Sequence, residues 1–143
     1  MSKPLQLKYF EQIVEICASK NKLMTIHIRK AEKDAIRILE KYHPTKAIIH
    51  WYTGGCDDML RLVDLGCYFS INTNMVKGSK KENYNLLPLE RILIESDGPY
   101  TKVNNKKYTP ALLKDAYEEI SRFYNNPDLP RNIYYNFKKI LLS

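Results

Sequence analysis

Short apolar, β-branched runs alternate with amphipathic helical segments along this chain, and this alternation restricts the fold more than any other feature. The runs typical of buried strands are residues 23–28, 46–52, 67–72 and 91–97. The segments with helical periodicity are residues 5–20, 30–42, 57–65, 111–124 and 131–142. Strands that alternate with helices indicate a parallel sheet with right-handed crossovers. We therefore predict an α/β domain whose four strands are neighbours in sequence order.

The length of the chain limits the architecture further. Its 143 residues suit one domain with a sizeable core. A complete (β/α)₈ barrel usually needs about 250 residues, so the chain cannot comfortably hold one. No apolar run approaches the roughly 18 residues of a membrane span, and no basic-then-apolar leader opens the sequence, so we expect a cytoplasmic protein without a membrane partner.

The charge and the cysteines say less about function. The formal net charge of +7 favours polyanionic partners such as DNA, because each neutralised phosphate releases condensed counterions. A face of solvated lysines explains the same charge equally well. Cys17, Cys56 and Cys67 share no CxxC spacing and are predicted to be reduced core thiols. The polar stretch 73–85, rich in Lys and Asn, is expected to be a long loop.

Two histidines and one carboxylate lie towards the ends of predicted strands. His27 and His50 lie in the first and second strands, and Asp97 ends the fourth. Because the carboxyl ends of parallel strands meet at one edge, these side chains are expected to converge there. Imidazole and carboxylate together suit a divalent cation such as Zn²⁺, Mn²⁺ or Mg²⁺. Histidines that only fill a core or a rim would show the same pattern.

Two residues close in sequence to these candidates each have two interpretations, and the third histidine has one. Glu95 lies two residues before Asp97 and is expected on the same face, or paired with a basic residue. Arg29, two residues after His27, is either a phosphate contact or an ordinary rim charge. His43 precedes a proline in a turn and is expected at the surface.

Three ordered segments carry a resemblance to a known family. The segments IHIRKAEKD (26–34), IIHWYTGG (48–55) and ILIESDGPY (92–100) resemble the IHxRxAxxD, IHxFxG and LLxETDxPY motifs of the TatD family of metal-dependent deoxyribonucleases. The resemblance extends over nearly the whole chain. The segments HWYTG (50–54) and ESDGP (95–99) also resemble the corresponding sequences of TatD-like nucleases from Qat antiphage systems.

The resemblance implies a fold and a set of site residues. TatD enzymes are (β/α)₈ barrels, so residues 1–143 would form a partial TatD-like metallohydrolase barrel domain, the C-terminal half with strands 5–8. His27, His50 and Asp97 match metal-ligand positions of the family, whereas its HxH pair and its GEIGLD-like segment are not found here. The resemblance further implies that Asp97 acts as general base, and that Arg29, Lys30 and the basic loop 77–81 contact DNA phosphates.

The implied function is metal-dependent cleavage of DNA phosphodiesters, as an exonuclease that needs the missing half. That half would come from another chain or from a homo-oligomer. Two alternatives stay open: a non-catalytic fragment or interaction module that keeps half the fold, and an amidohydrolase-like enzyme with a non-nucleic substrate. The chain itself would be a natural fragment, one part of a split protein, or the product of a gene start placed too late.

Overall fold

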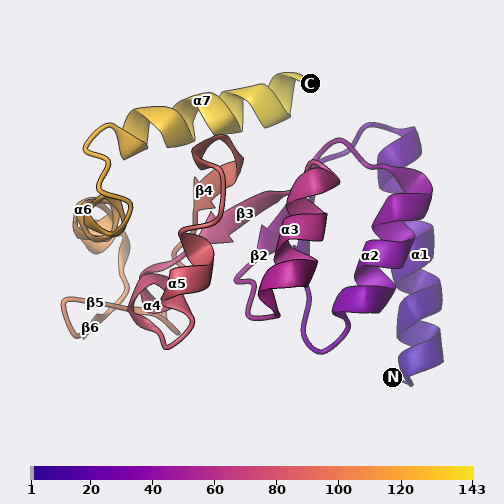
Figure 1. Cartoon of the computed structure of the whole chain (residues 1–143), viewed down its shortest axis with the longest axis horizontal. Coiled ribbons are helices and arrows are strands. Elements are labelled where there is room, and N and C mark those ends of the chain that lie inside the picture. The colour runs from indigo at the N-terminus through magenta and orange to yellow at the C-terminus, as the bar shows by residue number, and fades with distance from the viewer. Residues whose placement is uncertain (1) are drawn as a thin grey trace.

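The fold is built on one parallel sheet, in a computed structural model that describes residues 2–143 (Figure 1). The sheet has the order β1-β2-β3-β4. Its strands are β1 (Met24–His27), β2 (Ala47–His50), β3 (Tyr68–Ile71) and β4 (Ile92–Ile94). All three pairings are parallel, with His27 opposite His50 and His50 opposite Ser70. The predicted α/β class, strand order and pairing are confirmed.

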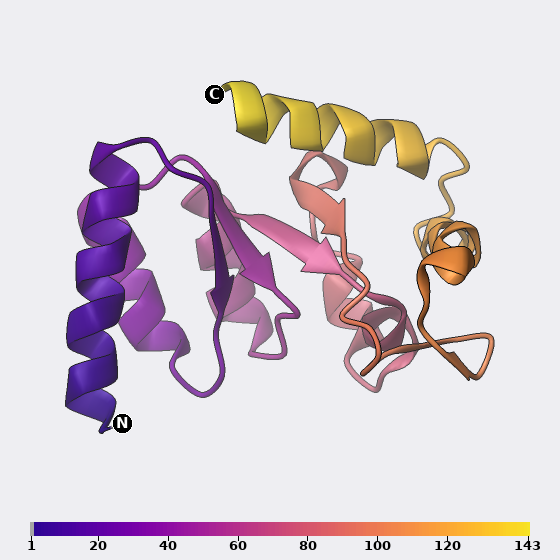
Figure 2. The same ribbon diagram turned by 180° about the vertical axis from the view of Figure 1, so that it is seen from behind.

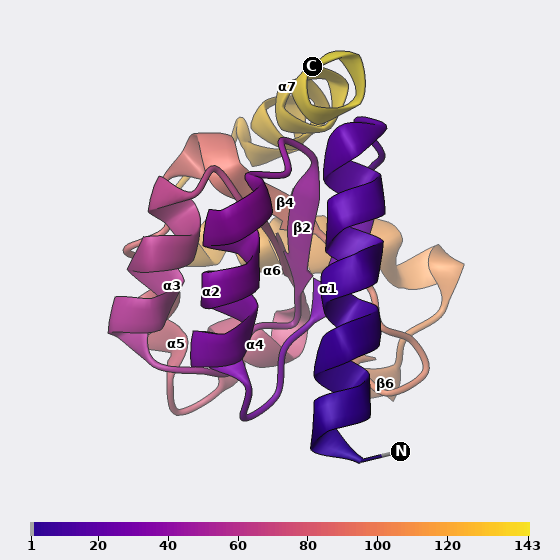
Figure 3. The same ribbon diagram turned by 90° about the vertical axis from the view of Figure 1, so that its right-hand side faces the viewer.

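Three helices stand side by side at one end of the sheet, as Figures 1 and 3 show. They are α1 (Lys3–Ser19), α2 (Glu32–Tyr42) and α3 (Cys56–Asp64). Helix α2 lies in contact with both of the others. At the far end, α6 (Leu113–Phe123) and α7 (Leu129–Leu142) pack against each other, and α7 lies against β4 (Figure 2).

Local chemistry explains where α2 begins and ends. Glu32 and Asp34 lie in its first turn and Lys41 in its last, which complements the helix dipole. His43 adopts a left-handed conformation as the C-cap, and Pro44 prevents continuation of the helix. The side chain of His43 is exposed, as predicted.

The two faces of the sheet differ in character, because successive side chains of a strand point to opposite sides. One face carries Ile26, Ile49 and Phe69, which belong to the hydrophobic core. The other face carries Ser70 and His50, so polar groups accompany the apolar ones there. Any chemistry of the strands themselves is therefore confined to the second face.

The structure corrects the prediction that residues 73–85 form a long loop. They contain α4 (Thr73–Lys77) and α5 (Lys81–Tyr84). The Asn72 side chain caps α4 by accepting hydrogen bonds from two backbone N–H groups. Met75, Val76 and Tyr84 are buried. Met75 and Val76 are adjacent and Tyr84 lies far from them among Lys and Asn, so the three residues do not define a helical period.

Several boundaries also differ from the prediction. The strand expected over 91–97 is limited to β4, preceded by a 3₁₀ turn, η1 (Leu89–Arg91), and another 3₁₀ turn, η2 (Pro110–Leu112), precedes α6. A hairpin of β5 (Lys102–Val103) and β6 (Lys106–Lys107) was not predicted. Its turn residues have positive φ angles, as a tight hairpin turn requires.

The cysteines are unpaired, as predicted, but only one is fully buried. Cys67 lies in the core, while Cys17 and Cys56 are half-buried. The prediction of three core thiols is therefore correct for Cys67 alone. Within residues 2–143, no helix combines the length and the apolar character needed to cross a bilayer.

Candidate functional site

The candidate site lies at the carboxyl ends of the four strands, an edge called the rim below. His50 is the last residue of β2, and Asp97 follows β4. The Nε2 atom of His50 lies 3.5 Å from Oδ1 of Asp97. Both side chains are about one quarter exposed, at 24% and 25%. The fold thus brings together two predicted site residues that are far apart in the sequence, with β3 and its connections between them.

His27 lies beside this pair. It is the register partner of His50, and the two imidazole centroids are 5.5 Å apart. However, no group of three or more His, Cys, Asp or Glu side chains within residues 2–143 is arranged to hold a metal ion. The role of His27 as a third ligand stays a prediction.

The His50–Asp97 pair has the chemistry of two ligands to one cation. Imidazole and carboxylate both bind Zn²⁺, with bonds of about 2.0–2.2 Å, so two tetrahedral ligand atoms lie about 3.4 Å apart. The observed 3.5 Å between Nε2 and Oδ1 fits such a pair. This distance is compatible with two ligands of one divalent cation, and the metal-binding role of His50 and Asp97 stays a prediction.

Glu95 also faces the site, on the same side as Asp97, as predicted. It also pairs with a basic residue, as the alternative prediction had it, because its carboxylate contacts Nδ1 of His50 as well as the hydroxyl of Ser70. Its other oxygen accepts a hydrogen bond from Asn72 Nδ2 at 2.9 Å. Sequence reasoning missed Ser70 and Asn72, although polar residues two positions apart in an apolar strand signal a shared polar face.

Two of the segments that carry the site have unusual backbone conformations. Trp51 and Asp97 have φ angles of 39° and 45°, in the left-handed region that ordinary side chains rarely adopt. Such conformations persist only where the surrounding structure enforces them, and they concentrate at functional sites. Trp51 immediately follows His50 at the end of β2, and Asp97 is itself a candidate ligand, in the segment after β4.

Buried tyrosines hold the segment after His50. Tyr84 Oη donates to the backbone oxygen of Tyr52 at 2.8 Å, and Tyr52 Oη donates to the oxygen of Gly55 at 3.0 Å. Burial raises the pKa of both phenols, and the carboxylates of Asp58 and Glu32 add to the rise at Tyr52. Both tyrosines therefore keep their protons and act as hydrogen-bond donors at neutral pH.

The segment after β4 is anchored as well. The Tyr100 N–H donates to the oxygen of Asp97 at 2.9 Å, and the Thr101 hydroxyl donates to the oxygen of Ser96. Thr73 Oγ1 donates to the oxygen of Lys102 at 2.8 Å, which ties the hairpin to α4. These bonds hold Asp97 in place from both sides of its turn.

The basic residues predicted to contact phosphates differ in whether their side chains already have a partner within the protein. Arg29 and Lys30 are exposed in the loop that follows β1, and neither forms an ion pair with another of residues 2–143. In the basic loop, Lys77 pairs with Glu119 at 2.6 Å, and Lys80 donates to the oxygen of Thr53 at 2.7 Å. Arg29 and Lys30 therefore have more available charges than Lys77 and Lys80, and exposed Lys81 likewise forms no ion pair with another of residues 2–143.

Comparison with known proteins addresses the family. The sequence model described as "TatD related DNase" matches residues 1–141, nearly the entire chain. The chain belongs to this TatD family. It is 34% identical over 103 residues to the deoxyribonuclease Tat-D of Schizosaccharomyces pombe, a match that covers 69% of this chain and 33% of the relative. It is 31% identical over 104 residues to the human 3'-5' RNA nuclease TATDN2, covering 68% of this chain and 14% of that protein.

Solved structures support the TatD fold. A TatD family hydrolase from Entamoeba histolytica superposes with a TM-score of 0.79 at 17% identity, covering 97% of this chain and 57% of that one. The TatD homologue YjjV of Escherichia coli gives 0.78 at 15% identity, covering 98% of this chain and 59% of that one. The chain thus spans little more than half of these TatD structures, and its sheet is part of a TIM-barrel-like TatD fold.

Proposed function

We propose that this chain is the C-terminal half of a TatD-type nuclease, which cleaves DNA phosphodiesters once a complementary half completes the barrel. The observation that carries the proposal is the His50–Asp97 pair at the rim of a chain that matches the family over residues 1–141. Strands 5–8 of the barrel would then correspond to β1–β4.

Each rim residue has a role in this proposal. His27, His50 and Asp97 would hold divalent metal, which would supply positive charge to neutralise the scissile phosphate and to acidify the attacking water. Asp97 accepts the proton of that water as general base. Arg29 and Lys30 contact the DNA phosphates from the loop beside His27. Zn²⁺, Mn²⁺ and Mg²⁺ all remain candidates for the cation, because imidazole and carboxylate ligands admit each of them.

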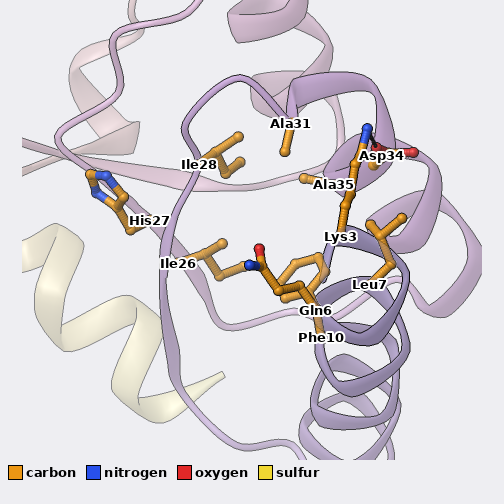
Figure 4. Close-up of a pocket in the computed structure, with 10 residues that line it drawn as sticks. All are labelled: Lys3, Gln6, Leu7, Phe10, Ile26, His27, Ile28, Ala31, Asp34 and Ala35. Carbon is orange, nitrogen blue, oxygen red and sulfur yellow. Dashed lines mark ion pairs between the residues drawn. The ribbon is translucent and has the colours of Figure 1, made fainter. Parts of the chain in front are cut away.

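The open edges of the sheet support the need for a second half. Within residues 2–143, β1 and β4 each pair with one strand only. Beside β1 is a hollow of about 190 Å³, in which Ile26 points towards Phe10 of α1 and Ile28 towards Ala31 and Ala35, while His27 points away (Figure 4). Such a strand edge beside apolar side chains is a template for another strand.

A second hollow lies near β4. It measures about 530 Å³ and is lined by Ile48, His50 and Leu93 of the sheet and by Ile133 and Phe137 of α7. It contains both a candidate ligand and apolar surface. A complementary half that pairs with β4 would cover the apolar part and bring further ligands towards His50.

The flanking helices carry exposed apolar residues that such a half would also cover. On α1 these are Leu5, Tyr9, Ile13 and Ile16, and on α7 they are Tyr134, Phe137 and Leu141. In both helices the spacing of three or four residues places them on one stripe. A surface of this kind on both sides of one sheet matches an occupant that reaches both edges, as the other half of a barrel does.

Reconstitution tests the proposal. Residues 1–143 would be mixed with the N-terminal half of a TatD relative, and nucleotide release from single-stranded DNA would be measured with Mg²⁺, Mn²⁺ or Zn²⁺ and with EDTA. We expect metal-dependent release from the mixture and little from either half alone. Asp97→Asn in the mixture should lower the rate by about 10²–10⁴, the usual contribution of a general base.

The remaining outcomes separate the alternatives. Assembly without cleavage of any substrate would favour the interaction module, and cleavage of small esters or amides but not DNA would favour an amidohydrolase-like enzyme. Single-stranded RNA belongs in the same assay, because one relative is named as an RNA nuclease. End-labelled DNA would show whether cleavage is exonucleolytic. A role in antiphage defence rests only on the sequences of residues 50–54 and 95–99.

A further inference from the structure

A network of buried polar groups lies directly beneath His50. Its centre is Glu95, whose side chain is only 12% exposed. One carboxylate oxygen, Oε2, contacts Nδ1 of His50 and accepts a hydrogen bond from the Ser70 hydroxyl. The other, Oε1, accepts from Asn72 Nδ2 at 2.9 Å. Both oxygens of a nearly buried carboxylate are thus committed to partners on β2 and β3 and at the end of β3.

Helix α4 fixes the direction of these hydrogen bonds. Asn72 Oδ1 accepts from the backbone N–H groups of Asn74 and Met75, at 3.1 and 3.2 Å. An amide whose oxygen is used in this way must present its NH₂ group on the other side, towards Glu95. A flipped Asn72 side chain would place its NH₂ group against these two N–H donors and its oxygen against Glu95. Oε1 of Glu95 is therefore an acceptor by necessity.

We propose that Glu95 is a positioning residue, which holds the His50 ring with its proton on Nδ1 and leaves the lone pair of Nε2 directed to the rim. Ser70 and Asn72 both donate to Glu95, so its carboxylate faces Nδ1 of His50 as an acceptor, and Nδ1 is the ring atom that carries the proton. The Nε2 lone pair then faces Oδ1 of Asp97 at 3.5 Å. Two acceptors that face each other attract a cation or a proton donor into the space between them.

The inference rests on the proposed function only in the use made of Nε2. Histidines that bind metals generally donate their second ring N–H to a carboxylate or a carbonyl, which fixes the tautomer and the orientation of the ring. The Glu95 network supplies that support to His50. Within residues 2–143, no carboxylate or carbonyl accepts a hydrogen bond from the His27 ring. The only ring that the His27 ring contacts there is that of His50.

The tautomer can be measured directly. In residues 1–143 labelled with nitrogen-15 at histidine, long-range proton–nitrogen spectra distinguish a protonated ring nitrogen from a bare one. We expect His50 to be protonated at Nδ1 and bare at Nε2. A proton on Nε2 in the unaltered protein would overturn the proposal without any variant.

Substitution of Glu95 by Gln gives a sharper expectation. Asn72 still requires an acceptor at Oε1, so the new amide must place its NH₂ group towards Nδ1 of His50. The ring would then move its proton to Nε2, and its lone pair would no longer point to the rim. Glu90→Gln, a matched change at an exposed position, should leave the His50 spectrum unaltered. An unchanged His50 tautomer in a folded Glu95→Gln protein would also overturn the proposal.

A second readout separates this inference from the nuclease proposal. In the reconstituted barrel, Glu95→Gln should weaken Zn²⁺ or Mn²⁺ binding by about 10–100-fold, as loss of a partner to a ligand does. Unchanged affinity would show that the tautomer has no bearing on metal binding. Because the spectra need neither metal nor DNA, a protein that cleaves no DNA would still report whether Glu95 sets the tautomer.

Discussion

His50 Nε2 and Asp97 Oδ1 lie 3.5 Å apart, although their strands, β2 and β4, are separated in the sheet by β3. The two side chains reach each other because they lie on the same face and project at the same end of parallel strands. Neither atom is a donor when the His50 proton is on Nδ1. In the proposed function, these two atoms would share a cation.

Metal affinity should depend on this pair. In the reconstituted barrel, His50→Ala is expected to weaken Zn²⁺ binding by more than about 100-fold, the upper end of what loss of a supporting partner costs. Isothermal titration calorimetry would measure the Zn²⁺ affinity of each variant. His43→Ala is the matched control, since His43 is exposed at the C-cap of α2. Equal losses in both variants would remove His50 from the metal site.

The DNA contacts should appear in the salt dependence of binding. Each phosphate contact contributes about 0.7 to the slope of log K against log salt for single strands, so Arg29→Gln with Lys30→Gln should reduce the slope by about 1.4. Fluorescence anisotropy of labelled DNA would give the slope. Lys138→Gln with Lys139→Gln removes the same charge from exposed positions on α7 and should leave it nearly unaltered. If the α7 pair lowers the slope as much, the contacts lie elsewhere.

The chain alone should self-associate through its uncovered apolar stripes. Ile13 and Ile16 of α1 are both more than half exposed. We expect sedimentation velocity to show association that increases with concentration, and Ile13→Ser with Ile16→Ser to reduce it without loss of stability. A strictly monomeric chain at every concentration would contradict this expectation, and with it the need for a covering half.

Asn136 should anchor α7 to the start of β4. Its Nδ2 donates to the backbone oxygens of Leu89 and Ile92, at 2.7 and 2.8 Å, from a buried position. Asn136→Ala leaves both oxygens without this partner, so urea unfolding should show a loss of about 1–3 kcal/mol. Lys138→Ala on the exposed side of the same helix should stay within about 0.5 kcal/mol of the unaltered protein. A comparable loss in both would mean that α7 is held by other contacts.

Cys67 should be the least reactive thiol. Burial raises the pKa of Cys67 to about 12, so almost no thiolate forms at pH 8. Ellman's reagent should therefore titrate Cys17 and Cys56 in the native protein and all three thiols in urea. Since the pKa is higher in the folded state than the ordinary 9.0, this thiol's contribution to folding is complete below pH 9 and is lost as the pH rises towards 12. Rapid native reaction of three thiols would contradict both expectations.

The sequence by itself determined the class of fold, the strand order and the family. Apolar runs and amphipathic segments have periods of two and 3.6 residues, and these follow from backbone geometry before any tertiary contact forms. The positions of His27, His50 and Asp97 at the rim could be predicted for the same reason, since parallel strands share a carboxyl edge. The distances between their side chains could not be predicted from the sequence.

Only the tertiary structure decided which partners these residues have. Glu95 is flanked in sequence by Ile94 and Ser96, yet its hydrogen bonds go to His50, Ser70 and Asn72 on other segments. The helices in 73–85 likewise depend on the Asn72 cap and on burial of Met75 and Tyr84 against the rest of the core. Periodicity describes how a segment repeats along its own axis. It carries no information on which distant groups satisfy a buried carboxylate, because that depends on the register between strands and on the packing of the whole fold.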